Sequence, residues 1–418
     1  MPHSILTPTQ ITREALRVLH SELSFIGNVN RAYDNSFAQS GAKIGQTLNV
    51  RMPSKYSVRT NATYAGQDHI ERSTPLTVSS QYGVDVSFSS LDWTMSLDDI
   101  SKRVLKPAMA QLAAKIESDA LAVAMKSVAN YVGTTSTQMS YKSFQQQGQV
   151  LTENLGPRAD RAALLNPLSK VEFLDAVKGL FNDPGTLSEA YVEGKLGRTG
   201  GFTVFENTLI PSHTIGSLAG TPLTTGTFGS SVTTNAWVSQ TAIDLDGATS
   251  GTTIKAGDVL TFGTLAAGLV DVHPESKVSL GKLKKFVATA DVTVLTAGTA
   301  TVTVVPGVIY GVGNAFQNCS RTKADTDNMT VTNWGAASTA VGQNLAFCKD
   351  AFVFTSCDLA DVGPYGAKCA RENMDGISMR WAQQYSVSSD AIVGRFDVLW
   401  GFAPLYPELA VRHIHTLA

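Results

Sequence analysis

Several groups of residues in this chain are of types that could bind phosphate, hold a metal ion or transfer protons. A glycine-rich stretch runs Gly194-Lys195-Leu196-Gly197-Arg198-Thr199-Gly200-Gly201. It lacks the GxxxxGK[ST] order of a phosphate-binding loop, and no strong apolar strand precedes it. Because glycine is the usual residue of tight turns, the stretch favours a turn over a phosphate site.

Four lysines form the most concentrated basic group, Lys277, Lys282, Lys284 and Lys285. Such a group could contact phosphates of a nucleic acid. Proteins that hold single strands also place aromatic side chains between their basic residues, where bases stack. No aromatic residue is interleaved here, so we favour a solvated face of a β-hairpin.

Groups that could do acid–base or nucleophilic chemistry are sparse. His413 and His415 alternate on one face of a predicted strand, and we interpret them as a solvated edge. Asp98 and Asp99 precede an apolar helical pattern, where a helix cap explains them better than a carboxylate pair. There is no GxSxG elbow and no HExxH motif. We therefore predict no catalytic residue, no bound cofactor and no enzymatic activity.

The four cysteines, Cys319, Cys348, Cys357 and Cys369, fit no CxxC pair, and no histidine lies among them. Zinc sites need closely spaced Cys or His ligands, so we predict no metal site. We expect free and mostly buried thiols.

The composition is poor in charge for a chain of 418 residues. Charged residues make up 16% and hydrophobic residues 43%, whereas typical domains carry about 25% charged residues. Either much surface is buried against partners, or much of the chain is Thr/Ser/Gly-rich β-structure. The net charge of -2 gives no basic field for gripping nucleic acid. No run of 18 apolar residues indicates a membrane span, and the first residues show no secretory signal.

The first predicted element after the N-terminal region is an extended arm. The strand-like runs Leu48–Met52 and Val84–Phe88 flank a polar, glycine-containing segment. We predict a long hairpin with Arg59, Glu71 and Arg72 at its tip. A hairpin that cannot bury itself is marginally stable alone, so this one should lie on another molecule. The three charged residues are the candidate subunit-interface residues.

Helical periodicity marks two further regions. Residues 8–24 read as an amphipathic helix, and a long apolar stripe runs from Ile100 to Val128. Pro107 must kink or restart the second helix, so we predict segments 97–105 and 107–132, ended by Gly133.

The rest of the chain changes character twice. Residues 135–215 look mixed, with a buried strand at 162–165 and a helix at 168–181. No Lys or Arg occurs between Arg198 and Lys255, and many short strands follow, so we predict an inserted antiparallel β-barrel or sandwich at about 217–336. The chain then returns to α/β character, with 379–387 and 392–400 predicted to pair.

The order of these parts, with several local stretches, carries a resemblance. The stretches are Asn166-Pro167 after an apolar strand, Glu189-Ala190-Tyr191, Gly200-Gly201-Phe202, Leu209-Ile210-Pro211 and Lys255-Ala256-Gly257-Asp258. The chain resembles the coat protein family of the short-tailed enterobacterial phage P-twenty-two, which has the HK-ninety-seven-like capsid fold.

The resemblance implies an α+β tailed-phage major capsid fold with peripheral and axial domains and an inserted barrel. The implied segments are an N-terminal arm (1–43), an extended loop (44–91), a spine helix (92–134), a first core part (135–216), the inserted barrel (217–336) and a second core part with return strands (337–418). The family's barrel carries a charged loop between capsomers. Here Trp237 to Gly251 has only Asp244 and Asp246 as charges, so this chain departs from the family at that loop.

The resemblance also implies a function. The chain would assemble with itself into the hexamers and pentamers of an icosahedral head around double-stranded DNA, with a scaffolding protein and a portal as partners and weak contact with DNA. It would be found in the virion capsid, assembled in the host cytoplasm and without a membrane. The alternatives are a β-rich adhesin or receptor-binding protein, which lacks a visible signal peptide or trimeric repeat, and an enzyme whose site we cannot assemble.

Overall fold

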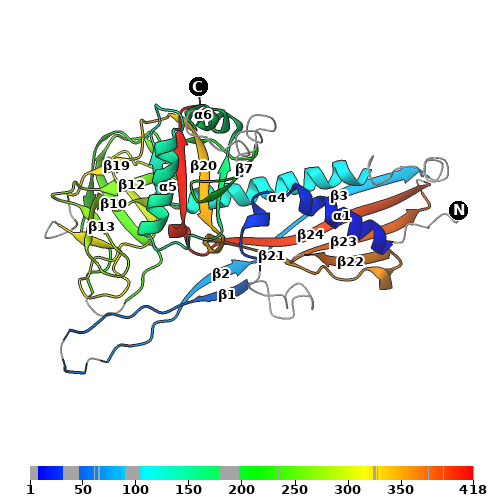
Figure 1. Cartoon of the computed structure of the whole chain (residues 1–418), viewed down its shortest axis with the longest axis horizontal. Coiled ribbons are helices and arrows are strands. Elements are labelled where there is room, and N and C mark those ends of the chain that lie inside the picture. The colour runs from blue at the N-terminus through cyan, green and yellow to red at the C-terminus, as the bar shows by residue number, and fades with distance from the viewer. Residues whose placement is uncertain are drawn as a thin grey trace. The chain divides into compact units, whose positions relative to one another are not determined.

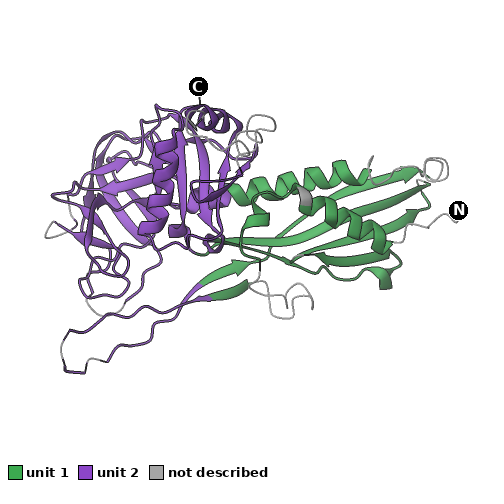
Figure 2. Cartoon of the chain, in the orientation of Figure 1, with its two compact units in different colours: residues 1–50, 74–121, 352–405 green, residues 51–73, 122–351, 406–418 purple. Residues whose placement is uncertain are grey.

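The computed structural model divides into two compact units (Figure 2). Unit 1 comprises residues 1–50, 74–121 and 352–405, and unit 2 comprises 51–73, 122–351 and 406–418. Within these units the structure describes residues 8–31, 47–60, 62–64, 66–89, 104–177, 197–232, 236–322, 326, 328–374, 376–388 and 390–417. In those ranges no helix combines the length and apolar character that a membrane crossing requires.

Unit 1 is built on a five-stranded antiparallel sheet (Figure 1). Its strands are β21 (Phe352–Cys357), β24 (Ala391–Pro404), β23 (Ile377–Ser386) and β22 (Lys368–Met374) in that order, with β3 (Ser80–Ser89) also paired to β24. The predicted pairing of 379–387 with 392–400 is confirmed by the β23–β24 ladder, which joins Arg380 to Asp397 and Ser386 to Ala391.

Two helices carry apolar stripes in the predicted places. Helix α1 (Pro8–Glu22) packs on β22 and β23, and the side chains of Ala15, Leu16 and Leu19 are buried. Helix α4 (Lys106–Ser127) has Pro107 in its first turn, where a missing N–H is tolerated. It stops before the predicted end at 132, because residues 131–133 instead form a strand that pairs with β25. The predicted segment 97–105 and the Asp98–Asp99 cap lie, except for 104–105, outside the described residues.

The predicted partner of the first arm strand is wrong. Strand β1 (Thr47–Met52) pairs with β2 (Arg72–Thr77), whereas Val84–Phe88 belongs to β3. Along β3 every second side chain is half-buried, including Val84 and Val86. A strand with one half-buried face is best placed in a larger sheet, where a long partner also satisfies its backbone groups. Strand β24 offers that partner along the whole of β3.

Unit 2 contains a seven-stranded sheet with buried central strands. Its order is β4 (Tyr131–Gly133), β25 (Ala410–His415), β20 (Ala340–Cys348), β5 (Arg161–Leu165), β7 (Phe202–Glu206) and β6 (Arg198–Thr199), with β8 (His213–Thr214) also on β20. The predicted strand at 162–165 is confirmed, and all of β5 is buried.

Two helices of unit 2 close the core beside this sheet. Helix α5 (Tyr141–Glu153) starts with a capping box between Ser140 and Ser143, and α6 (Pro167–Val177) starts after Asn166. The rings of Phe144 and Phe173 lie 4.7 Å apart in the apolar core. The predicted helix at 168–181 is confirmed to residue 177, and the remainder lies outside the described residues.

The segment predicted as an inserted barrel holds a nearly closed sheet. Its six strands run in the order β19 (Val331–Asn333), β12 (Val259–Phe262), β15 (Phe286–Ala288), β17 (Ala300–Val305), β10 (Thr241–Ala248) and β9 (Gly220–Thr225). An isolated bridge from Leu223 to Thr330 links the two ends of the sheet. Smaller sheets pair β11 (Thr253–Ile254) with β16 (Val292–Thr293), and β13 (Leu269–Val272) with β14 (Ser279–Leu283) and β18 (Cys319–Arg321).

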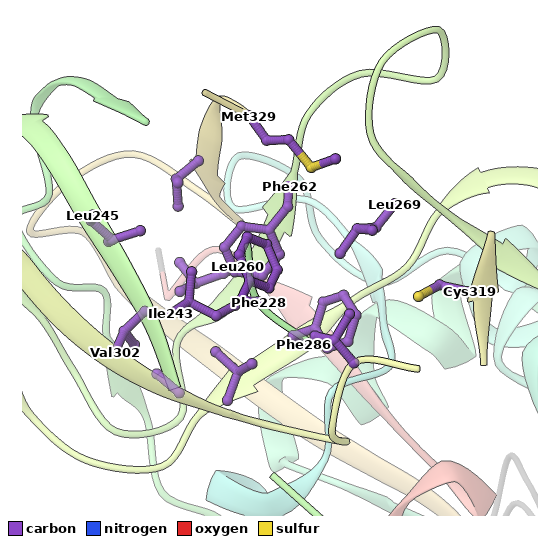
Figure 3. Packing of buried hydrophobic residues seen from close by; sticks show 14 of the residues in the cluster. Phe228, Ile243, Leu245, Leu260, Phe262, Leu269, Phe286, Val302, Cys319 and Met329 are labelled. Atoms are coloured by element: carbon purple, nitrogen blue, oxygen red, sulfur yellow. The ribbon is translucent and has the colours of Figure 1, made fainter. Parts of the chain in front are cut away.

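One apolar cluster fills this barrel. Phe262 lies at its centre, with ring centroids 5.8 Å from Phe228 and 5.6 Å from Phe286 (Figure 3). Ile243 and Val302, which are paired on the neighbouring strands β10 and β17, are fully buried in the same cluster. Alternation along β10 and β17 sends these residues inward and polar ones outward, as expected for strands that bury one face.

Candidate assembly surface

The arm, defined here as residues 53–71 between β1 and β2, runs out and back as two extended segments (Figure 1). Side chains tie the two segments together in place of a sheet. The amide of Gln67 both accepts from the Ser57 N–H, at 2.8 Å, and donates to the Ser57 carbonyl, at 2.6 Å. Ser54 donates to the Ile70 carbonyl, and the Tyr56 hydroxyl lies 2.9 Å from Nδ1 of His69. The arm is therefore held in shape by polar contacts rather than by a core.

The arm exposes large apolar side chains. Val58 is 91% exposed, Tyr64 86% and Tyr56 60%. Contiguous exposed apolar groups on a soluble protein mark interaction surfaces, because their burial stabilises only a complex. The sequence prediction singled out charges and missed these residues. The signal was present in the alternation of Tyr56, Ser57 and Val58 within a segment that otherwise reads as polar.

The three predicted interface residues lie at different places on the arm. Arg59 is at the exposed outer end, where it donates to the Thr63 carbonyl over 2.9 Å. Glu71 is exposed near the base and lies 3.6 Å from Arg51. The prediction that Glu71 and Arg72 sit at the tip is wrong for both, because Glu71 pairs with β1 at the base and Arg72 opens β2 and is only 7% exposed. Its Nη2 donates to the Pro53 carbonyl, and its guanidinium lies 5.2 Å from the centre of the Phe316 ring.

The lysine cluster is not a solvated face. Lys285 donates to the Tyr131 carbonyl at 2.7 Å and lies over the Tyr131 ring, and burial lowers its pKa to about 8. Lys284 pairs with Asp271 at 3.0 Å, and Lys282 pairs with Glu153. These lysines are partly buried because they bond groups of β4, of β13 and of α5, which sequence spacing does not reveal.

The fourth lysine of the group is also engaged. Lys277 donates to the carbonyls of Pro274, Ala315 and Gln317 at 2.6, 2.9 and 3.1 Å, and burial lowers its pKa to about 8. A side chain that satisfies three carbonyls fastens one loop to another. It leaves little donor capacity for a phosphate.

A buried arginine completes the junction between the inserted barrel and the core sheet. Arg412 on β25 donates to the Gly257 carbonyl at 2.9 Å and lies 4.3 Å from the centre of the Trp334 ring. Burial lowers its pKa to about 9. Beside it, Asp258 accepts from the Gly216 and Lys255 amides. Burial acts to raise the Asp258 pKa, but these bonds and His213 outweigh it and hold the pKa below its ordinary value.

The predicted solvated edge at His413 and His415 is also wrong, since both side chains are buried. Strand β25 lies inside the sheet, and helices cover the face on which these rings stack, 5.9 Å apart. His413 contacts Ser143 at 2.9 Å, and His415 contacts the amide of Asn166 at 2.9 Å. Burial lowers the pKa of His413 to about 3, helped by the charge of His415, and burial alone lowers that of His415 to about 4.

The remaining candidate groups are structural. In the described ranges, no three or more His, Cys, Asp or Glu residues gather in a way that could hold a metal. The cysteines are free. Three are buried and Cys369 is half-buried, and burial raises the pKa of Cys319 to about 12, which keeps its thiol protonated. Gly200 and Gly201 form the two-residue turn of the β6–β7 hairpin with φ of +59° and +87°, which confirms the predicted turn.

Comparisons with known proteins extend this picture. The model of the P22 coat protein family (gene protein 5) matches residues 12–413. No curated protein matches the chain. Among solved structures, the capsid of Ralstonia phage GP4 has a TM-score of 0.44 at 6% identity, covering 94% of this chain and 91% of that one. Mycobacterium phage Che8 has a TM-score of 0.42 at 10% identity, covering 92% and 88%. The capsid of cyanophage P-SCSP1u has a TM-score of 0.42 at 12% identity, covering 90% of this chain and 84% of that one.

The α+β fold with its nearly closed inserted sheet and the family match together define a major capsid protein of the tailed-phage type. The chain belongs to the P22 coat protein family, which the match establishes over almost its whole length. That family is one of structural capsid proteins and not of enzymes.

Proposed function

We propose that this chain assembles with copies of itself into the hexamers and pentamers of an icosahedral head that encloses the double-stranded DNA genome of a phage. The observation that carries the proposal is the family match over residues 12–413. It favours a shell subunit over an adhesin or receptor-binding protein.

The arm is the proposed contact element between subunits. Burying Val58 and Tyr64 on a neighbouring copy would contribute about 1.5–3 kcal/mol for each side chain. An exposed ion pair contributes only about 0–1 kcal/mol. The apolar residues would therefore supply most of the affinity, while Arg59 and Glu71 would set register and partner choice.

The proposed partners follow from the same role. Besides itself, the chain would engage a scaffolding protein and a portal during assembly in the host cytoplasm, and it would end in the virion capsid. The near balance of 33 basic and 35 acidic residues supports weak, non-specific contact with packaged DNA, because strong phosphate binding needs a basic surface. We propose no enzymatic activity, no cofactor and no membrane association.

We also propose the six-part division described from the sequence, with an N-terminal arm at 1–43, an extended loop at 44–91 and a spine helix at 92–134. Two core parts at 135–216 and 337–418 would flank the inserted barrel at 217–336. The apolar cluster around Phe262 supports a separate core for the inserted part, since its members come from residues 228–331.

The test is expression of the chain with and without the genes that neighbour its own, followed by negative-stain imaging and sedimentation. We expect closed shells with a scaffolding protein and shells or aberrant polymers without it. Val58→Asp should suppress both while the monomer remains folded. Monomers alone at every concentration, even beside the scaffolding protein, would refute the proposal.

A further inference from the structure

We infer that Arg72 and Phe316 form a latch that fixes the direction of the arm, so that the inserted barrel positions the assembly arm. The inference rests on the proposed function, since it takes the arm to be the contact between subunits. It concerns a coupling inside one subunit, between the base of the arm and the loop at 306–318 of the barrel.

The first observation is the place of Arg72 at the arm's base. It stands where the returning segment enters β2, and its Nη2 donates to the carbonyl of Pro53, where the outgoing segment leaves β1. One guanidinium thus joins both sides of the base. Its planar face lies 5.2 Å from the centre of the Phe316 ring. At a site that excludes water, such a cation–π contact is stronger than at an exposed one.

The second observation is that Phe316 is held independently of the arm. The Phe316 N–H donates to Oδ1 of Asn314, and the amide of Asn314 donates to the Ala236 carbonyl at 3.0 Å. On either side, the carbonyls of Ala315 and Gln317 accept from Lys277. Phe316 itself is buried. The barrel therefore presents a fixed ring to the guanidinium, and the arm adopts the direction that this ring allows.

The third observation is what the other arm contacts do. The bonds of Ser54, Tyr56 and Gln67 run between the two segments of the arm. They set the segments against each other but do not set the arm against the barrel. A loosened latch would leave these bonds intact and remove a direct tie between the base of the arm and the barrel, so that of the ties described the attraction between Lys55 and Glu275 remains. Arg72 is thus a positioning residue for assembly, and its effect should reach the arm's exposed end without any change there.

The experiment measures hydrogen exchange in the purified full-length monomer, alongside the rate of shell assembly. Phe316→Leu keeps apolar volume but removes the aromatic face, Arg72→Lys keeps the charge but loses the planar group, and Arg72→Met removes both. We expect exchange at 47–52 and 72–77 to accelerate at least tenfold and assembly to slow at least fivefold in each variant. Exchange in β10 and β17 should remain unchanged. Phe316→Leu combined with Arg72→Met should be no worse than Arg72→Met alone.

Arg51→Met is the matched control, because it removes an exposed ion pair with Glu71 at the same level of the arm. It should leave exchange at 47–52 and 72–77 as in the parent. An exchange rate at the arm base of Phe316→Leu equal to that of the parent would overturn the latch. This outcome is decisive even if Arg72→Met does not fold. Faster exchange with parental assembly would overturn its role in positioning. If Val58→Asp assembles normally, the proposed arm contact is wrong, and the exchange result still decides the latch.

Discussion

The arm and the inserted barrel differ in how their extended backbone is held in place. Both contain extended backbone, and both must satisfy its polar groups. The barrel does so around a closed apolar cluster that includes Phe228, Phe262 and Phe286. The arm uses side-chain bonds, such as those from Gln67 to Ser57, and leaves Val58 and Tyr64 in water.

The difference indicates which contacts stabilise the folded monomer and which are left for contact with another subunit. Contacts removed from water contribute strongly to the free energy of unfolding, and contacts in water contribute little. Effects of substitutions on monomer stability should therefore rank by burial. Substitutions of exposed arm residues should instead act mainly on assembly. The four predictions below test this ranking from the largest expected stability effect to the smallest.

The largest effect is expected in the barrel core. Phe262→Ala removes a fully buried ring between two others and should lower the free energy of unfolding by about 3–5 kcal/mol. Denaturant unfolding followed by circular dichroism measures this. Leu265→Ala, in an exposed loop, is the control and should have an effect below about 0.5 kcal/mol. Equal effects of the two variants would contradict the assignment of this core.

Acid should destabilise the subunit through the buried histidines. The folded-state pKa values of about 3 for His413 and about 4 for His415 lie below the unfolded value of about 6.5. Above pH 6.5 both states are neutral and the full stability is present. As pH falls below 6.5, only the unfolded chain binds protons, so stability is lost until the folded values are reached. The pKa shift of His413 alone corresponds to a loss of about 3 kcal/mol between pH 7 and pH 4.

Urea unfolding at a series of pH values checks this expectation. His413→Gln should flatten the slope below pH 6, because glutamine does not titrate. His69→Ala, in the exposed arm, should leave the pH profile as in the parent. A parental slope in His413→Gln would show that this histidine is not responsible.

A buried carboxylate in unit 1 should have an intermediate effect. Glu117 on α4 is buried and accepts bonds from the Phe25 amide and from both the amide and the hydroxyl of Ser24. Glu117→Gln turns one acceptor into a donor facing these groups, and we expect a loss of about 1–3 kcal/mol. Thermal melts give the value, with the exposed Glu22→Gln as the control. A difference below about 0.5 kcal/mol between the two would mean that the bonds are not specific to the carboxylate.

The smallest stability effect and a large assembly effect are expected in the arm. Glu71→Lys disrupts an exposed pair with Arg51, so the monomer should change by no more than about 0.5 kcal/mol. Reversal of a charge at the proposed subunit contact should still impair shell formation, which light scattering can follow. Normal shells from Glu71→Lys and from Arg59→Glu would show that charge on the arm does not determine its contact.

Local periodicity predicted much of this fold. The stripe of α1, the buried strand β5 and the β23–β24 pair were readable, because alternation and helical spacing reflect which face is buried. The pairing of strands that lie far apart in the sequence was harder to predict. Nothing in Leu48–Met52 favours 72–77 over 84–88 as a partner, and only the presence of β24 decides it.

The candidate site was predicted less well than the fold. The exposed segment was found, but its apolar contact residues were missed because hydrophobic side chains are ordinarily expected inside. Arg72, His413 and Lys285 were all read as solvated since charge and polarity favour the surface. Each is buried by a partner far away in sequence, such as Phe316 or Tyr131, and residue spacing carries no information on that.

The position of β25 has a consequence for the order of synthesis. This strand, encoded late in the chain, lies between β4 and β20 and sends Arg412 to the Gly257 carbonyl. A nascent chain on the ribosome therefore exposes two open strand edges and an unfastened barrel until residues 410–415 have left the exit tunnel. Open edges invite pairing with other chains. Completion of this sheet therefore waits for residues 410–415, and polypeptides interrupted before β25 should be recognised as unfolded.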